Sequence, residues 1–235
     1  MTSKTPILQL EHLGMTFPGH PVFNDLNLTI NRGEFWSIVG ENGVGKTTLM
    51  RTILHQLRPT TGKVNYLPSV NAVRIGYVPQ FRNIDSEYPL TIRDFVGLNL
   101  TGWKLPWLSR GERQRVEDML KQTGLTKLAS RPIGQASGGE KQKAYLAQAL
   151  VERPNLLILD ESTASLDPVT KTELLDLVQQ INQTLDLTVL FVTHDIPLAR
   201  RYTQQFLMLT PQGTEQGAID QLTDQKVWRG EAEHV

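Results

Sequence analysis

The feature that most constrains this chain is a glycine-rich stretch, residues 40–48, that lies between two apolar runs. It fits the pattern G-x-x-x-x-G-K-[ST]. Glycines allow the backbone to bend so that successive N–H groups face one anion, and a helix that begins there adds the positive end of its dipole. The predicted phosphate-binding residues are Gly40, Glu41, Asn42, Gly43, Val44, Gly45, Lys46, Thr47 and Thr48.

The residues on both sides of this stretch support the interpretation. Residues 35–39 form a short apolar run, and apolar residues recur at helical spacing after the loop. The simpler alternative, a glycine-rich turn with an incidental lysine, does not account for that context. In loops of this kind the lysine, here Lys46, bridges the β- and γ-phosphates, and the hydroxyl of Thr47 binds Mg²⁺. The sequence therefore predicts a site for a nucleoside triphosphate.

Composition limits the other possibilities. The 235 residues suffice for one large domain or two small ones, and we expect a single domain, residues 1–235, with one core. The net charge is zero, so there is no basic field and nucleic acid is not an expected partner. The absence of Cys excludes a disulfide framework or a thiolate metal site. The apolar runs are too short to span a bilayer, so we expect a soluble chain unless a partner holds it at a membrane.

The region before the glycine-rich loop has the pattern of strands. Residues 7–17 and 26–39 carry short or alternating apolar runs separated by turn residues, which predicts an antiparallel β lead-in. At the end of the first run stands Phe17, whose ring either packs in the core or stacks on a nucleobase. Two short strands are predicted near residues 63–67 and 74–78, and the second leads to Gln80. A lone Gln at such a place is usually a solvated loop residue.

The middle of the chain has helical spacing and predicts a helical subdomain of about residues 85–152. Within it, Trp103 and Trp107 occupy a proline-broken loop, where they form either a local mini-core or part of a docking surface. The helices predicted from the spacing of apolar residues cover residues 47–57, 109–123, 141–152 and 169–185.

Two continuous apolar runs follow, residues 156–159 and 188–193, and both are typical of buried parallel strands. The first leads into Asp160 and Glu161, and the second into His194. A His at a strand end is more often structural than catalytic. Because the carboxyl ends of parallel strands bind ligands at one edge of a sheet, we expect these side chains, Gln80 and the glycine-rich loop to converge there.

These residue types suit phosphoryl transfer to water, which needs mainly positioning and charge stabilisation. Asp160 would hold Mg²⁺ through water, and Glu161 would polarise the attacking water. His194 would hydrogen-bond the γ-phosphate, and Gln80 would contact both Mg²⁺ and the attacking water. The predicted fold is α/β, with a parallel sheet, the antiparallel lead-in and the helical subdomain.

Taken in order, these motifs resemble those of the ATP-binding subunits of ABC transporters along most of the chain. The resemblance implies a P-loop ABC ATPase core that binds ATP and Mg²⁺. The matching positions are the P-loop at residues 40–48, the Q-loop Gln80, the signature at residues 136–140, the acidic strand end at residues 156–161, the D-loop at residues 165–167, the switch residue His194, and Phe17 at the adenine-stacking position.

Four positions depart from the family pattern. The signature Leu is Ala136 and the signature Gln is Glu140. The adenine-stacking Tyr is Phe17, which keeps the ring, and the Pro that commonly follows the catalytic Glu is Ser162. Ser137 and Glu140 also fit S-x-x-E, which alone would mean only a capped helix start. We expect Glu140 to fold back onto that start and activity to survive.

The resemblance also implies partners. ATP would be sandwiched between two copies of the chain, with Asp167 linking the two sites. The segment after Gln80, residues 81–108, would dock on a polytopic membrane permease, which places the chain at the cytoplasmic face of the membrane, with an extracytoplasmic substrate-binding protein as an indirect partner. The residues expected to contact the ATP of the other copy are Ser137, Gly138, Gly139 and Glu140.

The transported substrate is suggested by two stretches, residues 74–80 and 83–96, which are similar to the subfamily that imports zinc, manganese or iron. Residues 102–110 and 131–134 point the same way. The alternatives within the transporter class are a siderophore or haem importer and an efflux pump. Outside that class, a soluble ABC ATPase in cofactor assembly stays open, because chain length does not exclude it.

Overall fold

The structure is a computed structural model that describes residues 5–80, 84–100, 108–160 and 166–222. The chain separates into two compact units. The first unit comprises residues 1–73 and 182–235, and the second comprises residues 74–181. Each unit is described by itself.

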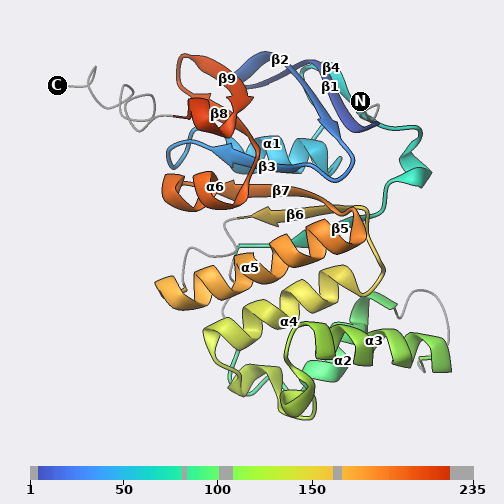
Figure 1. The fold of residues 1–235 in the computed structure, drawn as a ribbon. Coiled ribbons are helices and arrows are strands. Elements are labelled where there is room, and N and C mark those ends of the chain that lie inside the picture. Colours follow the sequence, from blue (N-terminus) through green and yellow to red (C-terminus); the bar gives the residue numbers. More distant parts are fainter. Residues whose placement is uncertain (1–4, 81–83, 101–107, 161–165, 223–235) are drawn as a thin grey trace. The chain divides into compact units, whose positions relative to one another are not determined.

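The first unit contains an antiparallel sheet in the order β2-β1-β4 (Figure 1). Its strands are β1 (Pro6–Phe17), β2 (His20–Asn31) and β4 (Thr61–Tyr66). In the second half of β2, buried apolar residues alternate with exposed polar residues, because one face of the sheet covers the core. The predicted antiparallel lead-in is therefore confirmed, and the tight turn that joins β1 to β2 contains Gly19 at φ +79°.

The first unit also contains the parallel strands that carry the glycine-rich loop. They are β7 (Thr188–Thr193), β3 (Phe35–Val39) and β8 (Gln205–Thr210), followed by the antiparallel edge strand β9 (Gly213–Ala218). Every residue of β3 and β7 is buried, as expected for parallel strands covered on both faces.

Two helices pack on these strands. Helix α1 (Lys46–Ile53) lies between them and the antiparallel sheet (Figure 1). Helix α6 (Ile196–Tyr202) packs against β3 and β7, and its Ile196 and Ala199 share a cluster of buried side chains with Phe206 of β8. The sequence patterns did not predict α6 or β9.

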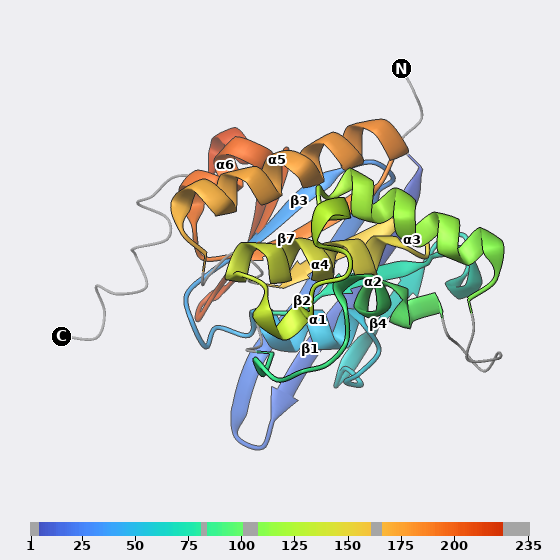
Figure 2. The ribbon, with the colours of Figure 1, turned by 90° about the horizontal axis from the view of Figure 1, so that it is seen from below.

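In the second unit, β5 (Ile75–Val78) pairs in parallel with β6 (Leu156–Asp160). Helix α5 (Pro168–Leu185) belongs to this unit as far as Ile181. The helical part consists of α2 (Ile92–Gly97), α3 (Arg110–Gln122) and α4 (Gly138–Leu150), which pack together (Figure 2).

A core of apolar side chains joins these three helices, with Ile92 and Val96 of α2, Leu120 of α3 and Ala144 of α4 all fully buried. The predicted helices over residues 109–123 and 141–152 correspond to α3 and α4. Short 3₁₀ turns, including Ile133–Gln135, connect the elements.

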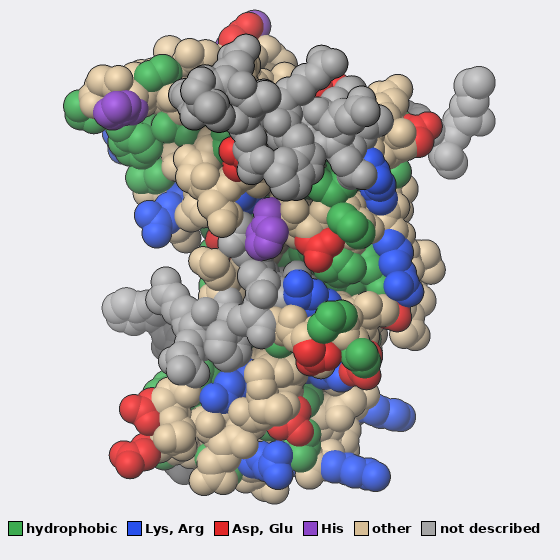
Figure 3. Space-filling model, turned by 90° about the vertical axis from the view of Figure 1, so that its left-hand side faces the viewer, with side chains coloured by type: hydrophobic (Ala, Val, Ile, Leu, Met, Phe, Trp, Pro, Cys, Tyr) green, Lys and Arg blue, Asp and Glu red, His purple; other side chains and the backbone are tan. Residues whose placement is uncertain are grey.

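The surface carries charges of both signs. Lys and Arg side chains are interspersed with Asp and Glu side chains over the face in Figure 3, in line with the equal numbers of acidic and basic residues. Among the described residues, no helix combines the length and the apolar character needed to cross a bilayer.

Candidate functional site

The glycine-rich loop connects β3 to α1 in the first unit, and its backbone takes conformations that favour glycine. Gly40, Gly43 and Gly45 have φ values of +153°, +85° and +109°. The loop is also closely packed, because a Cβ on Gly45 would lie 2.2 Å from Cγ1 of Val22, and a Cβ on Gly40 would lie 2.5 Å from the carbonyl oxygen of Leu209. Side chains at these positions would push the loop away from its neighbours.

Lys46 holds the loop from inside. Its side chain is buried, and Nζ donates to the carbonyl oxygens of Gly40 and Glu41, both at 2.8 Å. The loop therefore wraps around the ammonium group. Thr47, at the start of α1, is exposed. That helix has no side-chain cap and no acidic residue in its first turn, so its positive end is available to an anion. This arrangement fits a phosphate group.

His194 reaches the same edge of the same unit. Strands β3 and β7 are parallel neighbours, and Val39 pairs with Thr193, so the loop and His194 both begin where these strands end. His194 is exposed there. The next residue, Asp195, caps α6 by accepting the N–H of Leu198 on Oδ1 at 3.1 Å. The predicted placement of His194 beside the loop agrees with this register.

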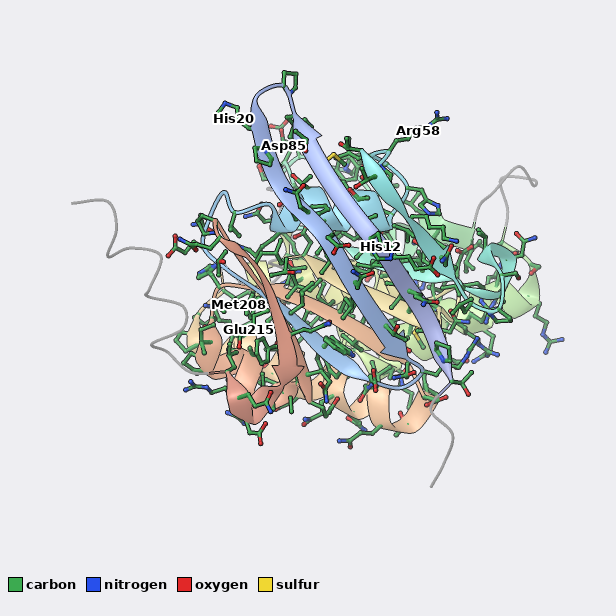
Figure 4. All side chains as sticks on the ribbon, turned by 90° about the horizontal axis from the view of Figure 1, so that it is seen from above. His12, His20, Arg58, Asp85, Met208 and Glu215 are labelled. Atoms are coloured by element: carbon green, nitrogen blue, oxygen red, sulfur yellow. The ribbon has the colours of Figure 1, made fainter. Side chains whose placement is uncertain are left out.

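Phe17 ends β1 beside the hairpin turn, at which Figure 4 shows His20. Its side chain is 42% exposed, so the core-packing interpretation is wrong for this residue. The ring is accessible for stacking. Figure 4 also shows Met208 of β8 and Glu215 of β9, which pair across the neighbouring antiparallel strands.

In the second unit, β5 and β6 bring a second group of predicted residues to one edge. Val78 pairs with Leu159, so Gln80 and Asp160 both follow the same pair of strand ends. Gln80 is exposed, and Asp160 is buried. Glu161 lies outside the described residues. The expected meeting of all four strand ends at one edge stays a prediction; the structure pairs them two by two, within each unit.

Tyr77 is a member of this group that the sequence patterns missed. Its hydroxyl donates to Oδ2 of Asp160 at 2.9 Å, which fixes the direction of the carboxylate. Tyr77 is also one of the larger exposed aromatic side chains, so its ring reaches the surface at this strand end. The sequence held one signal for this role. Tyr77 carries a hydroxyl group and lies in the predicted strand that leads to Gln80.

The predicted signature forms a capping box at the start of α4. Oγ of Ser137 accepts the N–H of Glu140 at 3.3 Å, and Oε2 of Glu140 accepts the N–H of Ser137 at 2.7 Å. The expectation that Glu140 folds back onto the helix start is therefore confirmed. Gly139 lies against α5, because a Cβ there would be 2.5 Å from Cγ2 of Thr170.

Asp167 caps α5. Its Oδ1 accepts the N–H groups of Val169 and Thr170, both at 3.1 Å, and its Oδ2 accepts the Thr170 hydroxyl at 2.6 Å. These bonds, the one from the Thr170 hydroxyl first, lower the pKa of the exposed Asp167. The carboxylate is thus ionised and serves as a helix cap.

Of the remaining predicted residues, Asn42 and Gly43 are exposed in the loop, Val44 and Thr48 are half-buried near α1, and Gly138 is exposed at the start of α4. Trp103 and Trp107, like Glu161, lie outside the described residues.

Comparisons with known proteins agree with these motifs. A family profile described as "ABC transporter" matches residues 23–164. The chain is 36% identical over 205 residues to the zinc import ATP-binding protein ZnuC of Saccharophagus degradans, covering 87% of this chain and 76% of that protein.

Two solved structures are similar throughout. One, described as a metal-chelate type ABC transporter in an inward-facing conformation, has a TM-score of 0.88 at 28% identity and covers 97% of this chain and 89% of that one. The other is a dimeric ATP-binding cassette in a post-hydrolysis state with ADP and phosphate bound. Its TM-score is 0.74 at 26% identity, and the match covers 91% of this chain and 99% of that one.

Proposed function

Because the chain belongs to the ABC transporter family of ATP-binding proteins, we propose that it powers the import of a divalent metal ion, zinc or manganese, through a membrane permease. Members of this family bind and hydrolyse ATP, dimerise and work with a permease. The observation that carries the ATPase assignment is the loop at residues 40–45, bent by glycines around the buried Lys46 and followed by an uncapped helix start.

ATP binding is assigned to the first unit. The N–H groups at the start of α1 would face the phosphates, and Lys46 would exchange its bonds to the carbonyls of Gly40 and Glu41 for the β- and γ-phosphates. The exposed ring of Phe17 would stack on the adenine. Hard oxygen ligands suit Mg²⁺, and the hydroxyl of Thr47 is the donor that this unit would supply.

Hydrolysis is assigned to residues of both units. Asp160, held by Tyr77, would contribute to Mg²⁺ binding, and the ion would offset the charge of the phosphates. Glu161 would polarise the attacking water, His194 would hydrogen-bond the γ-phosphate, and Gln80 would contact the metal and the water.

A second copy of the chain is proposed to complete each site. Ser137, Gly138, Gly139 and Glu140 at the start of α4 would meet the γ-phosphate held by the other copy, and Asp167 would link the two sites. The similarity to a dimeric cassette with ADP and phosphate supports this arrangement. Under this proposal, residues 1–235 act as one ABC-type domain with a helical subdomain of about residues 85–152.

The permease is proposed to contact residues 81–108. Two apolar side chains of this segment, Tyr88 and Leu98, are each 41% exposed, as a docking surface requires. Binding to a permease would hold the chain at the cytoplasmic face of the membrane, where a substrate-binding protein on the other side would deliver the ion. Nucleic acid is not a proposed partner.

The choice of metal import rests on similarity to the ZnuC protein, since the ATPase does not contact the transported ion. The similarity to a metal-chelate type transporter favours import of a metal chelate, such as a siderophore or haem, as a second candidate.

Cellular zinc, manganese and iron contents test the proposal. Cells carrying wild type, a deletion or Lys46→Ala would be grown with each metal scarce and analysed for the elements. We expect one metal, zinc or manganese, to fall in both mutants and to return with wild type. A fall in iron alone would favour the chelate candidate. Normal contents of all three metals, with purified protein still hydrolysing ATP, would contradict metal import and leave the ATPase assignment standing.

A further inference from the structure

Glu140 places a carboxylate in the first turn of α4, where the family pattern has an uncharged Gln. Its Oε2 atom accepts two hydrogen bonds, from the N–H of Ser137 at 2.7 Å and from Nη1 of Arg131 at 3.4 Å. The carboxylate therefore lies at the same helix start that would receive the γ-phosphate of the other copy.

A carboxylate at this place has two opposing effects. It stabilises the helix start, because anions are favoured near the positive end of the dipole. It also weakens the attraction of that helix start for a second anion, because like charges repel. A neutral Gln can accept the same hydrogen bond through its side-chain oxygen, but it carries no charge and so has neither electrostatic effect. With Glu140, a cation close by would reduce this repulsion and strengthen the binding of a phosphate.

Arg131 is positioned to supply that cation. The two lysines that follow Glu140 in α4 have other partners: Nζ of Lys141 donates to the carbonyl of Ile84 at 3.3 Å, and Nζ of Lys143 pairs with Glu173 at 2.9 Å. The side chains of Arg131 and Glu140 are 45% and 27% exposed, so water and salt partly screen the pair and its effect is moderate.

The backbone around Arg131 is held by residues 90–92 at the start of α2 and by the turn that precedes Arg131. Its carbonyl accepts the N–H of Ile92 at 2.9 Å, its N–H donates to the carbonyl of Leu128 at 2.9 Å, and the N–H of Ile133 donates to the carbonyl of Leu90 at 2.8 Å. These bonds fix the backbone position of Arg131, from which its side chain extends to Glu140.

We propose that Arg131 is a positioning residue for the signature motif. It holds Glu140 against the N–H of Ser137 and neutralises its charge, so that the start of α4 keeps its attraction for the γ-phosphate of ATP bound by the other copy. The inference rests on the proposed function, in which the signature contacts that phosphate. Its distinctive consequence is that Arg131 matters only while residue 140 carries a charge.

The test is a double-substitution cycle on the full chain. ATP-driven dimerisation would be measured by sedimentation for wild type, Arg131→Gln, Glu140→Gln and the double variant, in low and high salt. Binding of a fluorescent ATP analogue to the monomer and thermal unfolding would be measured in parallel. Lys143→Gln is the matched control, because it breaks another ion pair of the same helix.

We expect Arg131→Gln to raise the ATP concentration for half-maximal dimerisation about five-fold in low salt, with a smaller effect in high salt. Monomer binding and the unfolding temperature should change no more than in Lys143→Gln. On the Glu140→Gln background, Arg131→Gln should have no further effect. In the chain that keeps Glu140, Arg131→Lys should change the ATP concentration for half-maximal dimerisation less than Arg131→Gln does.

Equal losses from Arg131→Gln on both backgrounds, or no loss on either, would overturn the inference. Failure of the proposed function looks different: wild type would then show no ATP-driven dimer, or Ser137→Arg would leave the dimer unchanged.

Discussion

Gly134 lies where the segment that follows Gln80 packs against the turn before the signature, and adding one methyl group there tests this packing. A Cβ on Gly134 would lie 2.3 Å from the carbonyl oxygen of Asp85 and 2.6 Å from that of Ser86. Both contacts are with backbone, so no side-chain rotation relieves them. The peptide at residues 85–86 must move by roughly 1 Å, since an overpacked site relaxes through backbone shifts.

The cost of Gly134→Ala follows from this displacement. Overpacking of a closed site costs about 1–3 kcal/mol, and for a chain of this size each kcal/mol lowers Tm by about 2–4 °C. We therefore expect Tm to fall by roughly 2–12 °C, from the same two relations. The displacement would also pull the Ile84 carbonyl away from Nζ of Lys141, which now donates to it at 3.3 Å.

Gly111→Ala is the matched control. Gly111 lies in the first turn of α3, is exposed, and has no atom within 4 Å of an added Cβ. Because Ala is the better helix former by up to about 1 kcal/mol, this variant should be as stable as wild type or slightly more stable. Thermal unfolding followed by circular dichroism compares the two variants. If Gly134→Ala has the same Tm as Gly111→Ala, the packing of residues 85–86 against Gly134 is refuted.

The remaining predictions concern the site. Lys46→Ala should weaken ATP binding at least about 100-fold, because the phosphates lose a buried cation. Unchanged affinity in calorimetry would contradict the assignment of the loop as the phosphate-binding site. Tyr77→Phe should raise the Mg²⁺ concentration for half-maximal hydrolysis, because Asp160 loses the bond at 2.9 Å; an unaltered Mg²⁺ dependence would show that the carboxylate needs no such support. Since hydrogen bonds lower the pKa of Asp167 in the folded chain, its contribution to stability is present above the ordinary value of 3.8 and is lost as pH falls through the lowered pKa. The Tm difference between wild type and Asp167→Ala should thus shrink as pH is lowered from 7 to below 3.8, and a constant difference would contradict the cap.

The parts of the fold that the sequence predicted are those with strong local signals. The strands around the glycine-rich loop are continuous apolar runs, α3 has apolar residues at helical spacing, and α4 begins with a Ser-x-x-Glu box at Ser137 that the structure contains. The two missed elements lack such signals. Helix α6 has only seven residues with Pro197 near its start, and β9 is a polar edge strand that its partner β8 holds in place.

The residues of the site stay a prediction, and of their contacts the sequence indicated the capping box of Ser137 and Glu140 but not two others. The bond from Tyr77 to Asp160 depends on the register of β5 against β6, which apolar runs alone do not determine. The pairing of Arg131 with Glu140 depends on the course of the turn between them. Both contacts join residues that are adjacent only after folding.

The most direct test of the central claim, that two chains build each ATP site, mixes two defective variants. Lys46→Ala lacks the phosphate loop, and Ser137→Arg lacks the signature, so each should be inactive alone. A mixed dimer would contain one intact site, and random pairing in a two-fold dimer predicts roughly a quarter of wild-type ATP hydrolysis in the mixture. Recovery of that size would support the shared site, and a mixture as inactive as its parts would contradict it.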